Sequence, residues 1–432
     1  MANLPEKFIT RMKSTLGSSY ADYERAMNES PSKALHLSSA VVGDREDYVV
    51  DRVGGLQKLP FPLCYAVGEG RPASLVYHAV GAYYMQEPSA MLPVASVDIP
   101  RGAKVLDMCA SPGGKSSLLA SRMKGDGLLV SNEIDRARAL VLRENLVRTG
   151  HMNTVITNMR PTAVADTFGG FFDVVLVDAP CSGEGMFRKE AEAVLNWSEA
   201  NVKACAHRQK EIVKSADECL KEGGTLVYST CTFSKEEDEE VVDYLLSIGY
   251  ELISPPEWVE KLGVNTGKGY KFYPHIFGEG QFFALLRKTG DSRPPVRMKK
   301  QLSRASSALQ KAVSEVVTIS GVCQKDDMLF LPALGFDLPC LMNGVLLGKT
   351  EKGRFIPSHN LFSALGSQCI NKLDLAPTDP SLSAYLRGEE ISALVHGWCA
   401  VLADGFPLGG GKGSGGGVVK NHYPKNLRKT AQ

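Results

Sequence analysis

Two cysteines stand where a thiol could act as a nucleophile. Cys181 lies in the segment Asp-Ala-Pro-Cys-Ser-Gly, and Cys231 lies in the segment Tyr-Ser-Thr-Cys-Thr. Each follows an apolar, strand-like run, at residues 172–177 and 225–228. A single buried cysteine is usually inert packing. Strand ends of an open α/β sheet share one crevice, however, so the repeated arrangement favours nucleophilic chemistry there.

A Gly-rich turn at residues 107–115 indicates a cofactor beside these thiols. It follows a strand-like run and precedes a helical pattern, and its glycines allow a ligand to approach the backbone closely. Its spacing matches neither a dinucleotide-binding GxGxxG motif nor a P-loop. Glu133 follows the next strand, where an acid can bind ribose hydroxyls. Turn and acid together predict a nucleoside-bearing cofactor without a triphosphate, and Cys109 within the turn is expected to pack against ligand or core.

The elements that position these residues alternate between strand and helix. Strands are predicted at 104–108, 128–132, 155–158, 172–177, 225–228, 251–254 and 281–287. Helices are predicted at 115–123, 136–149, 199–220 and 235–248. This order is typical of a parallel, doubly wound α/β sheet. The last two strands have only turns between them, which predicts that the final strand is antiparallel.

Changes in composition divide the chain into four regions. Residues 1–75 have a mixed composition and are predicted to contain two short amphipathic helices, and residues 76–289 contain the alternating pattern. Residues 290–304 have the composition of a linker, and residues 305–432 are predicted to form a mostly β module. The glycine run at 409–417 is expected to be a mobile loop or hairpin tip. Two basic stretches, 293–304 and 420–429, could contact phosphate, although basic tails are often merely solvated.

Overall composition narrows the setting without naming a function. The 432 residues carry a net charge of only +1, so any nucleic-acid surface must be local. The N-terminus lacks the apolar core of a signal peptide, and no run is long enough to span a membrane. We therefore expect a soluble, cytoplasmic protein with reduced thiols. The ten cysteines and eight histidines show no zinc-ligand spacing, so no metal is expected.

The acidic run that follows Ser234 has a simple structural explanation. Ser234 and Glu237 have the spacing of a helix capping box, and acids in a first helical turn suit the helix dipole. We expect this run to stabilise the 235–248 helix rather than to serve the site.

With these residues in view, the chain resembles the Sun class of bacterial ribosomal RNA cytosine-5 methyltransferases. The turn at 107–115, the Asp-Ala-Pro-Cys-Ser-Gly segment and the Ser-Thr-Cys-Thr segment occur in the family's order, after a family-like segment at 84–91. The ending at 404–409, followed by basic residues, resembles the F-type branch, which acts on 16S ribosomal RNA and carries a C-terminal PUA-like module. The family's tail often has Trp where this chain has Gly410.

The resemblance implies a Rossmann-like core that uses S-adenosylmethionine, an N-terminal RNA-recognition region and RNA as partner, with the chain acting as a monomer. It implies Cys231 as nucleophile, Cys181 as the residue that assists product release, and Asp178 near both the methyl donor and the cytosine. The implied cofactor-binding residues are Cys109, Ala110, Ser111, Pro112, Gly113, Gly114, Lys115, Glu133, Arg138 and Asp178. The acidic residue that often meets the adenine is missing from residues 158–160.

Three other interpretations stay open at the level of sequence. Pro180-Cys181 also resembles the nucleophile of DNA cytosine-5 methyltransferases, which would reverse the roles of the two thiols. Transfer RNA could be the substrate in place of ribosomal RNA. A catalytically silent RNA-binding assembly factor could keep the same fold.

Overall fold

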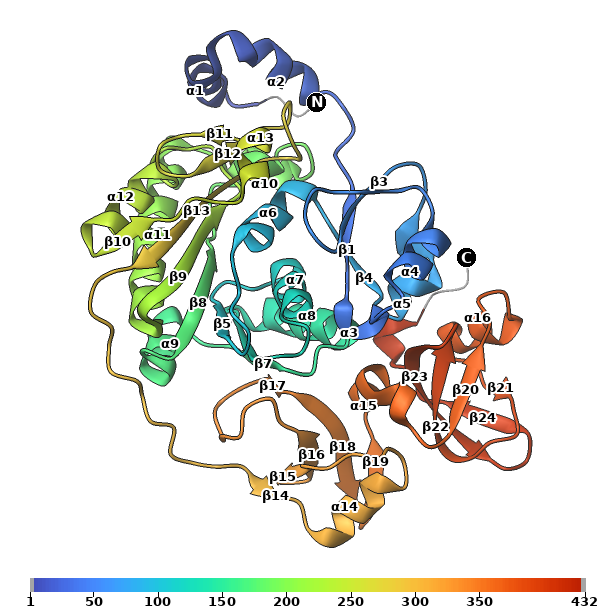
Figure 1. Cartoon of the computed structure of the whole chain (residues 1–432). Coiled ribbons are helices and arrows are strands. Elements are labelled where there is room, and N and C mark those ends of the chain that lie inside the picture. Colours follow the sequence, from blue (N-terminus) through green and yellow to red (C-terminus); the bar gives the residue numbers. More distant parts are fainter. Residues whose placement is uncertain (1–3, 429–432) are drawn as a thin grey trace.

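The computed structural model describes residues 4–428, and a ten-stranded sheet lies at its centre (Figure 1). Five strands run parallel in the order β9-β8-β5-β6-β7. They are β5 (Lys104–Asp107), β6 (Leu128–Asn132), β7 (Thr154–Thr157), β8 (Phe172–Asp178) and β9 (Leu220–Thr230). The predicted parallel, doubly wound architecture is confirmed.

Antiparallel strands complete both edges of this sheet. β13 (Gln281–Lys288) pairs antiparallel with β9, as predicted, and it also pairs with β10 (Tyr250–Leu252) and β12 (Tyr270–Phe272). The prediction that only turns separate β10 from β13 was wrong, because α13 (Glu257–Leu262), β11 (Val264–Asn265) and β12 lie between them. At the far edge β17 (Met342–Asn343) pairs with β7.

Helices cover both faces of the central sheet, because the strand residues that point to either face are apolar. One face packs against α9 (Pro161–Phe168), α11 (Glu199–Cys219) and α12 (Glu239–Ser247). The other packs against α6 (Pro88–Ser96) and α7 (Gly114–Met123). α8 (Arg136–Arg148) contributes Leu142 and Leu146 to a smaller cluster beside β7. Nearly continuous apolar strands of this kind are typical of a sheet buried on both faces.

The N-terminal part adds a short helical arm and a second sheet. The two predicted helices are present as α1 (Glu6–Leu16) and α2 (Tyr20–Ala26). A four-stranded antiparallel sheet follows, in the order β2 (Leu56–Lys58), β3 (Cys64–Val67), β1 (Ala34–Leu37), β4 (Tyr83–Gln86). Short helices α3 (Ser39–Val42), α4 (Glu46–Val53) and α5 (Val76–Ala79) lie between these strands.

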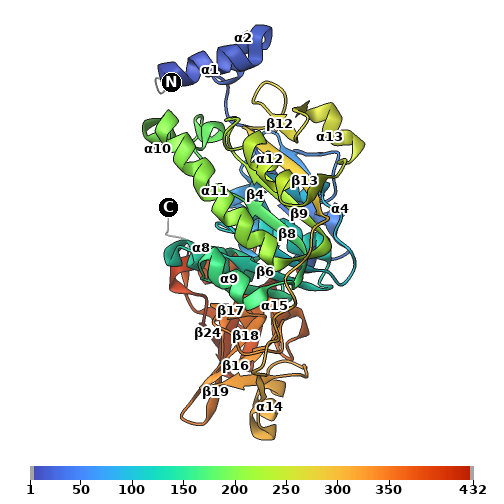
Figure 2. The same ribbon diagram turned by 90° about the vertical axis from the view of Figure 1, so that its left-hand side faces the viewer.

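Two five-stranded sheets make up most of the C-terminal part (Figure 2). The first contains β14 (Ser303–Arg304), β15 (Cys323–Lys325), β16 (Met328–Leu331), β18 (Val345–Glu351) and β19 (Arg354–Pro357). The second contains β20 (Lys372–Leu375), β21 (Ile391–Ser392), β22 (His396–Ala403), β23 (Phe406–Ser414) and β24 (Val418–Asn421). Their helices are α14 (Ser307–Ser314), α15 (His359–Leu365) and α16 (Pro380–Arg387).

Most of the glycine run at 409–417 is strand rather than the expected mobile loop, and the expected hairpin tip is confined to its last residues. Residues up to Ser414 belong to β23, which pairs with both β22 and β24, and only the next three residues form the hairpin turn. The glycines permit close packing: a Cβ atom at Gly410 would overlap the ring of buried Phe362. That ring therefore fills the space next to position 410.

The predicted capping box at Ser234 is also wrong. α12 begins at Glu239, and residues 235–238 form turns before it. The Ser234 hydroxyl donates to Glu184, and the Glu237 carboxylate accepts hydrogen bonds from Ser182. Both side chains are thus held by the loop that carries Cys181, so they cannot cap the helix.

Two further findings concern membrane-spanning helices and the predicted basic tail. Within residues 4–428, no helix is long and apolar enough to cross a membrane. Lys429, which belongs to the predicted basic tail, lies outside the described residues.

Candidate active site

The two predicted cysteines meet at the carboxyl edge of the parallel strands. Cys181 follows β8, Cys231 follows β9, and their sulfur atoms lie 3.1 Å apart. Neither side chain is fully buried. The pKa of Cys181 is raised well above its usual value, first by its hydrogen bond to Cys231 and then by burial. Cys181 is therefore held as a neutral thiol that can donate to Cys231.

Two buried carboxylates tie the cysteine loops together, and the sequence did not reveal either role. Glu184, from the Cys181 loop, accepts hydrogen bonds from the Phe233 backbone N–H at 2.8 Å and the Ser234 hydroxyl at 2.7 Å. Glu237 accepts from the Ser182 backbone N–H at 2.9 Å. Each loop thus supplies a carboxylate that accepts hydrogen bonds from the other loop, so the two loops fix each other's position.

Glu237 also has a markedly altered ionisation. It is fully buried and accepts a further hydrogen bond from the Gln209 side chain at 2.9 Å. Burial raises its pKa to about 7, although the hydrogen bonds from Ser182 and Gln209 oppose that shift. The expectation that this acid only stabilises a helix is thus wrong. The one signal in the sequence was an acidic run too long for a cap.

Asp178 ends β8 and is held by three side chains. Its Oδ2 atom accepts a hydrogen bond from the Lys115 ammonium at 2.9 Å, and its Oδ1 atom accepts one from the Ser229 hydroxyl at 2.8 Å. Gln281 approaches the same Oδ1 atom at 3.4 Å. The β8 and β9 ends thereby fix one carboxylate next to the thiols.

Lys115 is buried and makes its ion pair inside the site. Burial alone would lower its pKa, but attraction to Asp178 and to Cys231 raises it above its usual value. Lys115 therefore stays positively charged and stabilises negative charge on both groups. The opening turn of α7 places it there, since the helix begins at Gly114.

A cavity of about 180 Å³ lies next to Asp178. Seven of the predicted site residues line it: Cys109, Ala110, Ser111, Pro112, Gly114, Lys115 and Asp178. Four further residues, which we did not predict as site residues, complete the lining: Tyr84, Met85, Gln86 and Asp107. The first three belong to the segment that carried part of the family resemblance. Burial raises the pKa of Asp107 to about 7 and that of Cys109 above its usual value.

The other predicted cofactor residues lie around this cavity but do not line it. Gly113 has a left-handed backbone (φ +113°), and a Cβ atom there would come within 3.1 Å of Leu142. Glu133 is buried and accepts a hydrogen bond from the Asp135 backbone N–H at 2.9 Å. Arg138 is exposed, lies 3.7 Å from Glu133 and donates to the Ser111 carbonyl at 3.1 Å. The side chain of Asn158 binds the backbone carbonyls of Glu133 and Ile134.

Unpaired polar atoms show that this cavity suits a polar ligand. Within residues 4–428, the Oδ1 atom of Asp107 and the Oε1 atom of Gln86 are buried and accept no hydrogen bond. Both residues line the cavity. Buried acceptors without donors are costly, so a bound group with N–H donors would stabilise them. The ammonium of an amino-acid moiety, such as that of S-adenosylmethionine, fits this requirement.

The fold is the Rossmann-like fold of S-adenosylmethionine-dependent methyltransferases. A family model described as 16S rRNA methyltransferase RsmB/F matches residues 95–287, and a model described as methyltransferase RsmF PUA domain matches residues 372–429. These two matches show that the central and C-terminal parts of this chain are similar to the RsmB/F family.

Curated relatives carry the name ribosomal RNA small subunit methyltransferase F. The protein of Klebsiella pneumoniae is 34% identical over 314 residues, which cover 67% of this chain and 65% of that protein. The protein of Erwinia tasmaniensis is 40% identical over 52% of this chain and 48% of its own length. These matches thus span less than two thirds of either relative. A relative from Escherichia coli is 29% identical over 98% of this chain and 96% of its own length.

Solved structures support the fold of the central part. A methyltransferase homologue from Pyrococcus horikoshii is 26% identical and has a TM-score of 0.58. The match covers 66% of this chain and 96% of that protein. NSun6 from Pyrococcus horikoshii with SFG is 19% identical, with a TM-score of 0.60, and covers 67% of this chain and 100% of its own. At that identity the second likeness concerns the fold alone.

Proposed function

We propose that this protein transfers a methyl group from S-adenosylmethionine to C5 of cytosine in RNA, and that the RNA is 16S ribosomal RNA. The observation that carries the proposal is the pair of thiols 3.1 Å apart, beside Asp178 and the polar cavity. The names of the curated relatives support the ribosomal target.

Cys231 is assigned as the nucleophile. Cytosine C5 is a poor nucleophile, and addition of a thiolate to C6 makes C5 electron-rich, which divides one difficult step into easier ones. Lys115 attracts negative charge on Cys231, whereas the raised pKa of Cys181 keeps that thiol protonated. Because Cys181 is the thiol that stays protonated, we assign the attack on C6 to Cys231.

Asp178 and Lys115 position the base. Asp178 would accept a hydrogen bond from the exocyclic amine on the cytosine edge, and the neighbouring Lys115 ammonium would offset the electron density that N3 gains once the thiolate has added to C6. Lys115 and Ser229 hold the two carboxylate oxygens, so the carboxylate cannot rotate away. Such preorganisation stabilises developing charge without reorganisation during the reaction.

The cavity residues would hold the cofactor, which supplies an electrophilic methyl group when bound. The turn at 109–115 would cradle it, Glu133 would bind the ribose hydroxyls, and Asp107 and Gln86 would accept from its ammonium. Arg138 would hold Glu133 and the cofactor turn in place, since it contacts both Glu133 and the Ser111 carbonyl.

Cys181 is assigned to product release. After methylation C5 still carries its proton, and that proton must leave before the bond between Cys231 and C6 can break. A water molecule oriented by the neutral Cys181 thiol would take that proton, and Cys231 would leave C6 as a thiolate that accepts a hydrogen bond from Cys181, whose sulfur lies 3.1 Å away. The cytosine must be unpaired or flipped to reach these thiols.

Covalent trapping on a denaturing gel tests the assignment. Wild type, Cys181→Ala and Cys231→Ala proteins would each be mixed with 16S ribosomal RNA and S-adenosylmethionine. We expect a persistent protein–RNA adduct with Cys181→Ala and none with Cys231→Ala. An adduct only in Cys231→Ala would reverse the thiol roles. No adduct in any lane, together with no cofactor binding by calorimetry, would favour a silent RNA-binding factor.

Bisulfite sequencing of RNA from a deletion strain tests the target. We expect one or more 16S ribosomal RNA cytosines to lose protection in the deletion strain and to regain it when the gene is restored. Unchanged 16S sites with a change in transfer RNA would move the activity to transfer RNA.

A further inference from the structure

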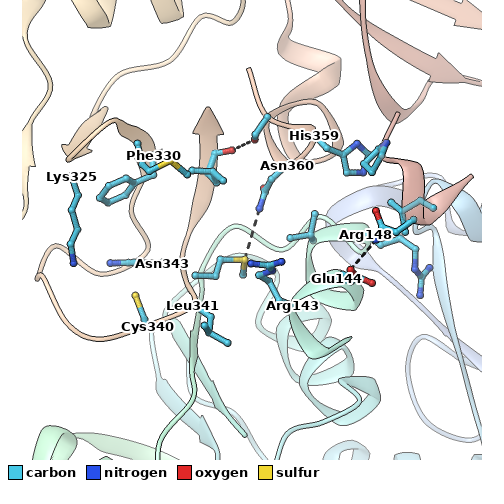
Figure 3. Close-up of a pocket in the computed structure, with 18 of the residues that line it drawn as sticks. Arg143, Glu144, Arg148, Lys325, Phe330, Cys340, Leu341, Asn343, His359 and Asn360 are labelled. Carbon is cyan, nitrogen blue, oxygen red and sulfur yellow. Dashed lines mark hydrogen bonds between the residues drawn. The ribbon is translucent and has the colours of Figure 1, made fainter. Parts of the chain in front are cut away.

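A second, larger pocket of about 610 Å³ lies where the central sheet meets the C-terminal modules (Figure 3). Its walls come from α8, from residues 325–346, from the start of α15 and from the tail around residues 424–427. Its volume is within the range of roughly 300–1,000 Å³ that is common for sites that bind small molecules. The active-site residues Asp178, Cys181 and Cys231 do not line it.

One wall is apolar and includes an aromatic ring. Phe330 lies on β16, is only half-buried, and does not belong to a core cluster within the described residues. Leu341 and Leu346 line the same pocket and are also partly exposed. Aromatic rings such as that of Phe330 stack with unpaired bases, and the two leucines would pack beside such a base.

Two polar residues at the start of α15, His359 and Asn360, also line the pocket. Within residues 4–428, the Nδ1 atom of His359 is buried and has no hydrogen-bond partner. Among the described residues, the Asn360 side-chain amide makes only a long contact of 3.8 Å with the Met342 sulfur. Burial lowers the pKa of His359 to about 4, so its imidazole is neutral at physiological pH. A neutral imidazole and a nearly free amide can read the edge of a base.

Arg143 supplies an unpaired positive charge. It lies on α8 and makes no ion pair or hydrogen bond in the described part of the chain, 4–428. The other cations of the lining are engaged: Arg148 donates to two backbone carbonyls, and Lys325 pairs with Asp337 at 2.6 Å. Of the two acids, Glu144 accepts from Asn426, and Asp326 is exposed. Arg143 is thus free to contact a phosphate.

We propose that this pocket binds one unpaired nucleotide of the RNA substrate, with its base against Phe330 and its phosphate at Arg143. The inference rests on the proposed function for the presence of RNA. It adds a recognition site, distinct from the thiol site, that would hold the strand while the target cytosine enters the active site.

Methyl NMR on the full chain tests the pocket directly. Protein labelled with ¹³C-methyl methionine would be titrated with each of four nucleoside monophosphates and with the matching nucleosides. We expect at least one nucleotide to shift the methyl signals of Met328 and Met342, which line the pocket. No shift at either methionine with any of the four nucleotides would overturn the proposal.

Three variants separate the contributions of base and phosphate. Phe330→Ala should weaken nucleotide and nucleoside binding alike, by about tenfold, the order expected for loss of one stacking contact. Arg143→Gln should weaken only the nucleotide. Arg354→Gln, an exposed cation of β19 outside the pocket, is the control and should change neither. Equal effects of all three variants would contradict the proposal.

The same proteins distinguish this proposal from the proposed function. Cys231→Ala protein should bind nucleotides in the pocket as well as wild type does. If methylation of 16S ribosomal RNA is observed, Phe330→Ala should raise KM about tenfold with little change in kcat. If nucleotides bind in the pocket but no RNA is methylated, the proposed function fails and the pocket proposal stands. If RNA is methylated but no nucleotide binds in the pocket, the pocket proposal fails and the proposed function stands.

Discussion

At the scale of single residues, the charge of Lys115 links the groups of the active site. Its ammonium pairs with Asp178 at 2.9 Å and attracts negative charge on Cys231. Removal of that charge leaves Asp178 without its ion-pair partner and removes the attraction to negative charge on Cys231. Lys115 therefore has an electrostatic role that a neutral side chain of similar length cannot replace.

We predict that Lys115→Met lowers the methylation rate about 100-fold, the order found when one preorganised electrostatic contact is lost. The rate should recover in part as pH rises, because more of the thiol is then ionised. Single-turnover rates from pH 6 to 9 measure both effects. Lys124→Met, at the exposed end of the same helix, should behave as wild type. A pH profile unchanged in Lys115→Met would argue against the charge effect.

Glu237 makes stability depend on pH in a definite direction. Its pKa is about 7 in the folded protein and 4.5 for an unperturbed glutamate. Between these values the folded state keeps the proton and the unfolded state loses it. The free energy of unfolding therefore falls as pH rises through this window, by up to about 1.4 kcal/mol per pH unit from this group.

We predict that Glu237→Gln removes this contribution and flattens the pH dependence of unfolding between about pH 4.5 and 7. An amide can still accept from the Ser182 backbone and donate to its hydroxyl, so the variant should fold. Denaturant titrations at several pH values give the slope. Glu240→Gln, at an exposed position three residues further on, should keep the wild-type slope, and an equal slope for Glu237→Gln would refute the prediction.

The residues of the site differ in how far sequence could identify them. Cys181, Cys231 and Asp178 lie at or just after the ends of neighbouring strands, so their proximity could be predicted from sheet topology alone. Their catalytic roles stay proposals. Glu184 and Glu237 could not be recognised, because their partners lie about 50 residues away along the chain. Only the folded loops show that these acids face inward.

At the scale of elements, the strand β23 shows how glycine can specify close packing. Gly410 lies in the strand, buried against Phe362, and no larger side chain fits between them. Periodicity of apolar residues cannot detect such a strand, since glycine has no side chain to create a pattern. The parallel strands β5 to β9 were predictable because their residues form continuous apolar runs.

We predict that Gly410→Ala destabilises the protein by about 1–3 kcal/mol, because the added methyl group overpacks a filled core. Gly416→Ala, in the exposed turn of the same hairpin, meets no close neighbour and should change stability by less than about 0.5 kcal/mol. Thermal unfolding of the two variants beside wild type makes the comparison. Equal melting temperatures for all three would show that the core beside β23 can accommodate an added methyl group.

At the scale of the whole molecule, the N-terminal part and the C-terminal module share one core. Residues of β1 and β4 pack in the same cluster as residues of β22 and β23. A polar contact lies beside it: Asp404, in the turn between β22 and β23, accepts hydrogen bonds from Tyr48 at 2.7 Å and Tyr77 at 2.6 Å. The ring of Phe406 lies under the guanidinium of Arg45, 3.5 Å from it. These contacts join segments more than 300 residues apart in sequence.

We predict that the double variant Tyr48→Phe/Tyr77→Phe loosens this junction while both parts stay folded. Hydrogen bonds to a charged acceptor contribute roughly 1.5–3 kcal/mol each when buried, and less here because Asp404 is partly exposed. Burial raises the pKa of Asp404, but hydrogen bonds from the two hydroxyl groups, together with the nearby charges of Arg52 and Arg45, hold this pKa below its usual value. Their stabilisation is therefore present at neutral pH and is lost as pH falls through the folded-state pKa.

Hydrogen exchange followed by mass spectrometry should show faster exchange in the variant at β4 and in the β22–β23 turn, but not in β5 or β8. The difference should be largest near pH 7, provided that rates are corrected for the intrinsic effect of pH. Tyr244→Phe is the matched control, because within residues 4–428 the Tyr244 hydroxyl makes no hydrogen bond. Faster exchange spread evenly over the central sheet would mean that the junction stabilises the whole fold rather than the position of the C-terminal module. Exchange confined to the junction would show that the module can shift relative to the site, as binding of a strand across both would require.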